Sequence, residues 1–243
     1  MKSKMSRAAV AVSVVATLGF TAACGGGGDE DKGADAKPSA TAAGDAKNEQ
    51  DGAGEAALTE AQLKAAALAQ GDVKGYKIAD LPAEEMPAEA VPAEPAACQP
   101  LANMFFFTSD PQAKARTGRR ATSVDELSAS VNALALAAHE QSDAEKVMAD
   151  LRKATESCDG YEHVGSKYTD IEALTAPEQG DEAVAYKLKG DIEGAKIPMS
   201  FTVVRSGSTL IAFSSMNMLD ADKAEVPAEI LDAQVAKLEK AAG

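Results

Sequence analysis

The fold class of this chain is decided by AVAYKLKGDIEGAKIPMSFTVVRSGSTLIAFSSM, residues 183–216. Ala183–Lys189 and Ile197–Arg205 alternate apolar with other side chains, and Leu210–Met216 is a third apolar run, a pattern typical of β-strands. The link Ser206-Gly207-Ser208 is short enough for a hairpin turn, so an antiparallel meander is predicted. The side chains predicted to face the core are Val184, Tyr186, Leu188, Met199, Phe201 and Val203.

Helical patterns flank this meander. Asp143–Ser157 is the clearest, because its apolar residues recur at i, i+3, i+4 and i+7 and lead to Cys158 on the inner face. Pro227–Lys240 and Glu60–Gln70 are predicted as further helices, the second one begun by a capping box and closed at Gly71. We therefore expect an α+β domain, in which helices pack on an antiparallel sheet.

The stretch before the clearest helix is ambiguous. Ser123–Ala138 fits one face of a helix, yet its second half also alternates like a strand that is buried on both faces. Ser142 and Glu145 have capping-box spacing for the next helix, so a helix here would leave almost no loop between the two. On that ground Ser128–Ala138 is predicted as a strand, with His139 at its end.

Two further strands and one loop complete the predicted domain. Gly75–Ile78 and Tyr161–Ala173 have the composition of strands, the second one polar. Leu81–Ala97 contains four prolines, which exclude a regular helix or a central strand. We expect this segment to be an extended, polyproline-like surface loop.

One basic cluster stands out in an acidic chain, at Lys114, Arg116, Arg119 and Arg120. Guanidinium groups suit phosphate and carboxylate ligands, so an anion site is one interpretation. The preferred interpretation is a solvated strand or loop in which these cations balance neighbouring acids.

The N-terminus has the features of an export signal. Three basic residues precede the apolar run Ala8–Phe20, which is too short to span a bilayer. Thr21-Ala22-Ala23-Cys24 then resembles a bacterial lipobox, in which the cysteine thiol receives a diacylglyceryl group, typically with palmitate chains. Residues 1–23 are therefore predicted to be a lipoprotein signal peptide, and Cys24 the lipidated first residue of a protein held on the outer face of the cell membrane.

The remaining chain divides into a linker and a domain. Residues 24–57 are predicted to be a lipidated, disordered linker, since alanine is the only apolar residue type after Cys24. Residues 58–243 are long enough for one hydrophobic core. Removal of the signal leaves 38 acidic and 21 basic residues, a net charge of −17, which argues against a nucleic-acid partner and against docking on anionic lipid headgroups.

The candidate site residues are few. Cys98 and Cys158 are the remaining thiols of an exported chain, so a disulfide is predicted between them. Phe105, Phe106 and Phe107 form the densest apolar cluster and are assigned first to the core. The histidines His139 and His163 stand outside any zinc or protease motif, and we predict no catalytic residue, metal or cofactor.

The order of features resembles the PknH-like extracellular sensor domain and related actinobacterial surface lipoproteins. The resemblance rests on Cys98-Gln99-Pro100-Leu101, on the helix ending at Cys158, on Gly180–Val184 and on Phe201–Gly207. It covers about Leu58–Met218 and implies a non-enzymatic α+β domain with a ligand cleft. The kinase-linked members have two short-range disulfides, whereas this chain has cysteines for one long-range bridge.

Three functions are compatible with these observations. The leading hypothesis is a non-catalytic ligand-binding or sensor-type lipoprotein, with Phe105, Phe106, Phe107 and Tyr168 as the possible lining of a cleft for a small-molecule, lipid or cell-wall ligand. A lipid or glycolipid carrier would need a large apolar cavity. A cell-wall hydrolase would need a histidine within hydrogen-bonding distance of a serine or aspartate. Protein partners are not predicted.

Overall fold

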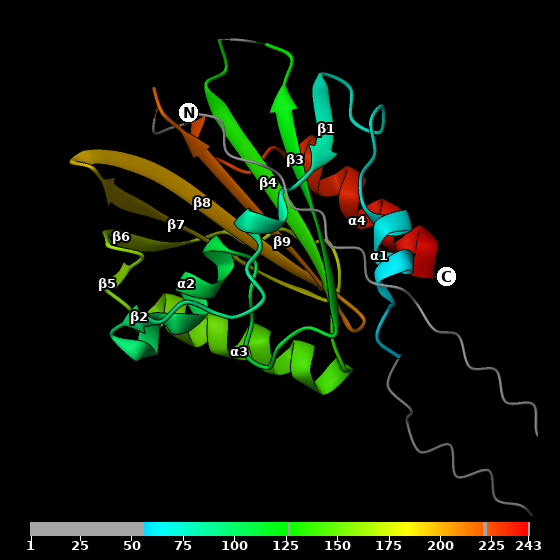
Figure 1. The fold of residues 1–243 in the computed structure, drawn as a ribbon, viewed down its shortest axis with the longest axis horizontal. Coiled ribbons are helices and arrows are strands. Elements are labelled where there is room, and N and C mark those ends of the chain that lie inside the picture. Colours follow the sequence, from blue (N-terminus) through cyan, green and yellow to red (C-terminus); the bar gives the residue numbers. More distant parts are fainter. Residues whose placement is uncertain (1–55, 126, 221–222, 243) are drawn as a thin grey trace, which may run out of the picture. The chain divides into compact units, whose positions relative to one another are not determined.

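The computed structural model describes residues 56–125, 127–220 and 223–242 (Figure 1). These residues form one nine-stranded antiparallel sheet and four α-helices, so the α+β prediction is confirmed. The predicted signal peptide, the lipidation of Cys24 and the linker up to residue 55 lie outside the described residues. In the part of the chain that is described, none of the helices has the length and hydrophobicity needed to cross a membrane.

The strand order in the sheet is β1-β3-β4-β9-β8-β7-β6-β5-β2, and each neighbouring pair is antiparallel. The strands are β1 Tyr76–Asp80, β2 Ala93–Glu94, β3 Ala115–Ser123, β4 Ser130–Ala138, β5 Gly160–His163, β6 Ser166–Leu174, β7 Glu182–Ile192, β8 Ala195–Ser206 and β9 Thr209–Asn217. The helices are α1 Glu60–Ala66, α2 Gln99–Phe105, α3 Gln141–Ser157 and α4 Ala228–Ala242. Two short 3₁₀ helices, η1 Ala83–Glu85 and η2 Ala96–Cys98, lie before α2.

The predicted meander is confirmed as β7, β8 and β9. Glu193 and Gly194 form the first tight turn, and both have positive φ angles, which suits the twist of a two-residue hairpin. Gly207 has a positive φ angle in the second turn, where Ser206 pairs with Thr209. All six side chains predicted to face the core are buried.

The sheet is covered on both faces, which explains the continuous apolar character of its central strands. Figure 1 shows α2 and α3 on one side of the sheet and α1 and α4 on the other. On β8, Val203 contributes to the core under α2 and α3, whereas its neighbour Val204 contributes to the core under α1 and α4. The same double burial holds for Leu134 and Ala135, so the predicted strand ending at Ala138 is confirmed as β4.

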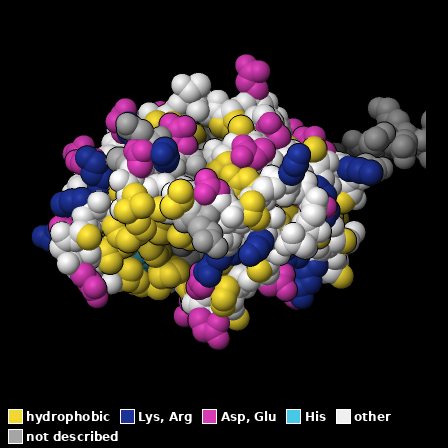
Figure 2. All heavy atoms as spheres, turned by 90° about the horizontal axis from the view of Figure 1, so that it is seen from above, with side chains coloured by type: hydrophobic (Ala, Val, Ile, Leu, Met, Phe, Trp, Pro, Cys, Tyr) yellow, Lys and Arg dark blue, Asp and Glu magenta, His cyan; other side chains and the backbone are white. Residues whose placement is uncertain are grey.

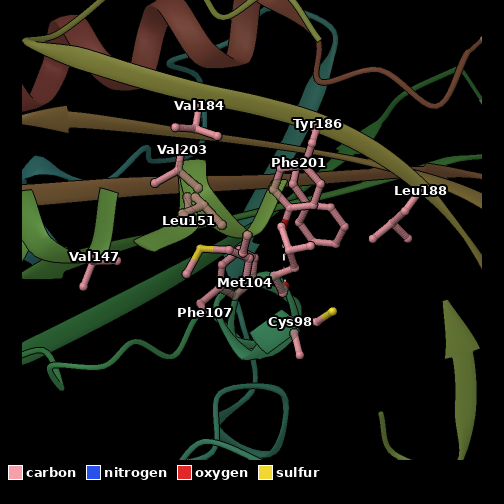
Figure 3. Packing of buried hydrophobic residues seen from close by; sticks show 14 of the residues in the cluster. Cys98, Met104, Phe107, Val147, Leu151, Val184, Tyr186, Leu188, Phe201 and Val203 are labelled. Carbon is pink, nitrogen blue, oxygen red and sulfur yellow. Dashed lines mark hydrogen bonds between the residues drawn. The ribbon is translucent and has the colours of Figure 1, made fainter. Parts of the chain in front are cut away.

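The core under α2 and α3 is built around aromatic stacking (Figure 3). The rings of Tyr186 and Phe201, which are cross-strand partners, stack with their centroids 5.1 Å apart. The Tyr186 hydroxyl donates a hydrogen bond to the Leu101 carbonyl of α2, 3.3 Å away. This bond satisfies the one polar group of a fully buried side chain and fixes α2 on the sheet.

The first helix is shorter than predicted, ending at Ala66 rather than at Gln70. Its N-terminal capping box, Thr59 with Gln62, is confirmed. Beyond Ala66 the backbone bonds to another helix, because the buried Gln234 side chain of α4 accepts from Leu68 N–H and donates to the Ala66 carbonyl, at 2.9 and 2.8 Å. A tertiary partner thus replaces the next helical turn.

Two further local predictions are wrong. Tyr161–Ala173 is a hairpin of two strands, β5 and β6, because Val164 and Gly165 have positive φ angles and reverse the chain. The capping box at Ser142 and Glu145 does not form, since α3 begins earlier and Glu140 is its N-cap residue without a side-chain hydrogen bond.

The proline-rich segment Leu81–Ala97 is irregular overall, as predicted, but it is not uniformly extended. It contains η1, the two residues of β2 and the start of η2. β2 is the edge strand of the sheet and pairs only with β5, a position in which neighbouring prolines are tolerated.

Candidate functional site: an aromatic-walled pocket

The phenylalanine segment is held by an unusual backbone turn at the end of α2. Phe107 adopts a left-handed conformation, with φ at 54°, which is costly for a bulky residue. Arg116 on β3 stabilises this turn, because its Nη1 donates to the Phe107 carbonyl at 2.8 Å and its Nη2 to the Pro87 carbonyl at 2.7 Å. One guanidinium therefore joins the phenylalanine segment to the proline-rich loop.

A pocket of about 220 Å³ lies beside this turn. We call it the aromatic pocket. Its floor comes from β3, β4, β8 and β9, and its walls from the phenylalanine segment and the proline-rich loop, whereas α3 contributes nothing. The lining residues are Leu81, Glu85, Phe105, Phe106, Phe107, Arg120, Val131, Ala133, Met199, Phe201, Ser214, Ser215 and Met216.

One lining residue of the pocket is an exposed apolar side chain: Val131 is 43% exposed. Hydrophobic side chains also gather in a patch on the face of the molecule that Figure 2 shows. Apolar surface of this kind on a folded domain is characteristic of binding sites.

The charged lining consists of one ion pair. Arg120 of β3 donates from Nη2 to both carboxylate oxygens of Glu85 in η1, with Oε1 at 2.5 Å. The Nε of Arg120 is buried and has no hydrogen-bond partner among the described residues. The pocket thus combines an apolar interior with a guanidinium that has one unbonded N–H donor.

The predicted cleft residues divide into two groups. Phe105, Phe106 and Phe107 all line the pocket. Tyr168 does not line the pocket: it is 1% exposed and lies behind Phe105, with the ring centroids 5.7 Å apart. Its ring also stacks on Tyr161 at 4.9 Å and lies 6.4 Å from the His163 ring. Ligand binding by these residues stays a prediction.

His163 completes an aromatic cluster behind the pocket wall, a position that the sequence pattern did not predict. Its ring lies 5.5 Å from that of Phe106 and 6.1 Å from that of Phe105, centroid to centroid. Burial lowers the pKa of His163, so the imidazole is neutral near pH 7. Burial likewise raises the pKa of Tyr168, which keeps the cluster uncharged.

The basic cluster serves mainly to hold the fold together. Arg119, whose side chain is 13% exposed, donates to the Leu68 carbonyl at 2.9 Å and pairs with Asp80 at 2.9 Å. Arg116 binds two carbonyls, as described above, and Lys114 lies 3.9 Å from Glu140. The preferred interpretation is confirmed in part: Lys114, Arg119 and Arg120 each pair with a neighbouring acid, but Arg119 is largely buried rather than solvated.

The predicted disulfide joins Cys98 and Cys158, whose Cα atoms are 5.6 Å apart. It connects the start of α2 to the end of α3. Both residues are buried in the core under the two helices. The bridge therefore anchors the helix that carries the phenylalanine segment.

The described residues contain no group of three or more His, Cys, Asp or Glu side chains placed to hold a metal ion. Within the same residues, the His139 ring nitrogens are buried without a partner, and His163 has only the Pro92 carbonyl, 3.4 Å from Nδ1. A serine or aspartate side chain hydrogen-bonded to a histidine ring, which the hydrolase hypothesis requires, is therefore not found in the described part of the chain.

Fold and site together define an α+β domain with a single antiparallel sheet, helices on both faces and a small apolar pocket beside the end of α2. The extracellular domain of PknH from Mycobacterium tuberculosis is similar to it, with a TM-score of 0.51 and 12% sequence identity over 76% of this chain and 98% of that one. The predicted resemblance is thus confirmed for the fold.

A second solved structure is a more distant match. It is an Rv0999 ortholog from Mycobacterium smegmatis, with a TM-score of 0.39 and 16% identity over 73% of this chain and 94% of that one. No known protein-family model matches the sequence, and no curated protein matches it significantly.

Proposed function

We propose that this chain is an extracytoplasmic lipoprotein, attached to the membrane through Cys24, whose domain binds a small apolar ligand without catalysis. The observation that carries the proposal is the aromatic pocket, in which Phe105, Phe106 and Phe107 stand over an apolar floor. Small-molecule sites are typically concave and apolar, with a few polar groups that orient the ligand. The Arg120–Glu85 pair is such a group.

An extracytoplasmic location is supported by three independent features. The N-terminal sequence has the organisation of a lipoprotein signal. The Cys98–Cys158 disulfide fits an oxidising compartment. The fold is similar to that of a domain that itself lies outside a cell.

The size of the pocket favours a small ligand over a lipid carrier. Its volume of about 220 Å³ exceeds an engineered cavity of about 150 Å³ that binds benzene. It is below the range of about 300–1,000 Å³ that is usual for drug-sized ligands. One ring or one short chain would fit, whereas a diacyl lipid would not.

Membrane attachment is tested by mass spectrometry of the full chain expressed in a bacterial host. We expect a mature N-terminus at Cys24 with a diacylglyceryl mass and recovery in the membrane fraction. The Cys24→Ala chain should be recovered without lipid. A wild-type chain that keeps residues 1–23, or that lacks the lipid mass, would contradict the proposal.

Binding is tested by calorimetry with short apolar probes, such as 1-octanol and toluene, on the full Cys24→Ala chain. Met216→Ala alters the pocket floor and should weaken binding at least severalfold. Met218→Ala is the matched control, because this methionine is 59% exposed and is not a lining residue. Equal loss in both variants, or no binding by the parent chain, would refute the assignment.

A further inference from the structure

The bonding of Arg120 within the aromatic pocket is incomplete. Both carboxylate oxygens of Glu85 accept from the same nitrogen, Nη2, while the adjacent Nε–H is buried and unbonded among the described residues. A carboxylate that lies side-on to a guanidinium engages two nitrogens at once, with one oxygen on each. Glu85 therefore pairs with Arg120 through Nη2 alone and leaves the Nε donor unused.

Glu85 is also easy to displace. It belongs to η1, a single 3₁₀ turn in the proline-rich loop that has no side-chain cap. The Glu85 side chain is 45% exposed and that of Arg120 is 38% exposed. Exposed ion pairs contribute little to stability, because water solvates both partners when they separate.

The rest of the pocket is suited to an apolar chain or ring. Apart from the ion pair and the serines Ser214 and Ser215, all lining residues are apolar. The charged end of a ligand could reach solvent at Arg120, and its apolar end could lie against Phe106 and Met216. Arg120 and the apolar floor are thus complementary to the two ends of an amphiphile.

We propose that the aromatic pocket binds a small anionic amphiphile, a carboxylate with one short apolar tail, and that Glu85 is a built-in competitor for its head group. In the ligand-free domain Glu85 pairs with Arg120. On binding, the ligand carboxylate takes Nε and Nη2 together, and Glu85 moves into solvent. This inference rests on the proposed ligand-binding function and specifies the class of ligand.

The two partners of the ion pair then have opposite effects on affinity. Arg120→Gln removes the cation and should weaken binding of octanoate about tenfold, and it should weaken binding of the neutral 1-octanol much less. Arg120→Lys keeps the charge but loses the planar fork, so it should restore only part of the loss. Glu85→Gln removes the competitor and should strengthen binding of octanoate about three- to tenfold.

The matched controls come from α3. Lys146 and Asp150 form an exposed ion pair one helical turn apart, outside the pocket lining. Lys146→Gln and Asp150→Asn change the net charge of the chain as Arg120→Gln and Glu85→Gln do. Neither control should change octanoate affinity, which separates a local effect from a general effect of net charge.

The experiment is calorimetric titration of the full Cys24→Ala chain with octanoate, 1-octanol and octylammonium, which share one tail and differ in charge. We expect octanoate to bind about tenfold more tightly than octanol and octylammonium to bind most weakly. This comparison on the parent chain does not depend on the folding of any variant. Three results would each overturn the inference: octanol binds as tightly as octanoate, octylammonium binds most tightly, or Glu85→Gln weakens octanoate binding. Each of these results would still be compatible with an apolar ligand pocket. No binding of any probe would overturn the proposed function as well.

Discussion

Acidification should destabilise this domain well above the pH at which its carboxylates titrate, and His139 is the main reason. This residue directly follows β4 and is 0% exposed, and neither ring nitrogen has a hydrogen-bond partner among the described residues. Burial lowers its pKa from 6.5 to about 4, against a smaller upward effect of the Asp143 charge and a further small lowering by Lys114. The folded domain therefore holds a neutral imidazole over a pH range in which the unfolded chain binds a proton.

The sign and size of the effect follow from this difference. Between pH 6.5 and 4 the unfolded chain binds more protons than the folded one, so the free energy of unfolding falls as the pH falls. The contribution of His139 is fully present above pH 6.5. At pH 5 the loss from His139 alone amounts to about 2 kcal/mol. Burial also lowers the pKa of His163, which adds to the loss in the same direction.

The assay is urea unfolding, followed by circular dichroism, of the parent chain and of His139→Phe at pH 7.5, 6.0 and 5.0. Carboxylates with lowered pKa, such as Asp72 and Glu182, are ionised in both states over most of this range and contribute little to the slope. The free energy of unfolding of the parent should fall by at least 2 kcal/mol between pH 7.5 and 5.0. The fall in the variant over the same range should be smaller by about 2 kcal/mol. His163→Phe measures the share of the other imidazole. A parent stability that is the same at pH 7.5 and 5.0, or an unchanged slope in His139→Phe, would refute the reasoning.

Three further perturbations test how the fold is held together. Replacing Cys98 and Cys158 by alanine opens a loop with a sequence separation of 60 residues, so the free energy of unfolding should fall by about 4 kcal/mol in the chain-entropy model. Two free thiols in the unreduced parent, measured by thiol titration, would contradict the bridge. Gly180→Ala adds a Cβ 2.4 Å from the Arg205 carbonyl at a φ of +72°, so the free energy of unfolding measured by thermal unfolding should fall by about 3 kcal/mol or more. Gly165→Ala is the control, because its φ is also positive, at +78°, but the space around it is open; it should lower the free energy of unfolding by about 1 kcal/mol. Arg116→Gln removes both hydrogen bonds that join the phenylalanine segment to the proline-rich loop. The free energy of unfolding should fall by about 2–3 kcal/mol, and the apolar probes should bind more weakly. A fully retained probe affinity would mean that other contacts hold the pocket wall.

The parts of the fold that the sequence predicted correctly are those in which one periodicity dominates a long segment. The alternation in β7 and β8 and the 3.6-residue period of α3 identified these elements and the side chains that they bury. The error at the end of α1 occurred because a distant residue supplies a backbone partner there. The end of α1 depends on Gln234, which lies 166 residues beyond Leu68 in the chain.

The candidate site was predicted only in part, because apolar character does not reveal a residue's neighbours. The three consecutive phenylalanines were recognised as a cluster, and they do form the pocket wall. Tyr168 was grouped with them, but its strand places it behind Phe105. Arg120 could not be separated from its basic neighbours by composition, although it is the cation of that cluster that lines the pocket together with Glu85.

The sequence by itself determined three features: the class of fold, the pairing of Cys98 with Cys158 and the burial of the central strands. They follow from periodicity, from the number of cysteines and from hydrophobicity, which can be read without knowing which residues are neighbours in space. Only the tertiary structure decided that β4 pairs with the other edge of β9, so that residues from distant parts of the chain, such as Ala133 and Ser214, share one pocket floor. The physical reason is that hydrophobic burial is non-directional: it drives a side chain out of water without selecting its partner, and the partner is selected by the order in which the strands pair.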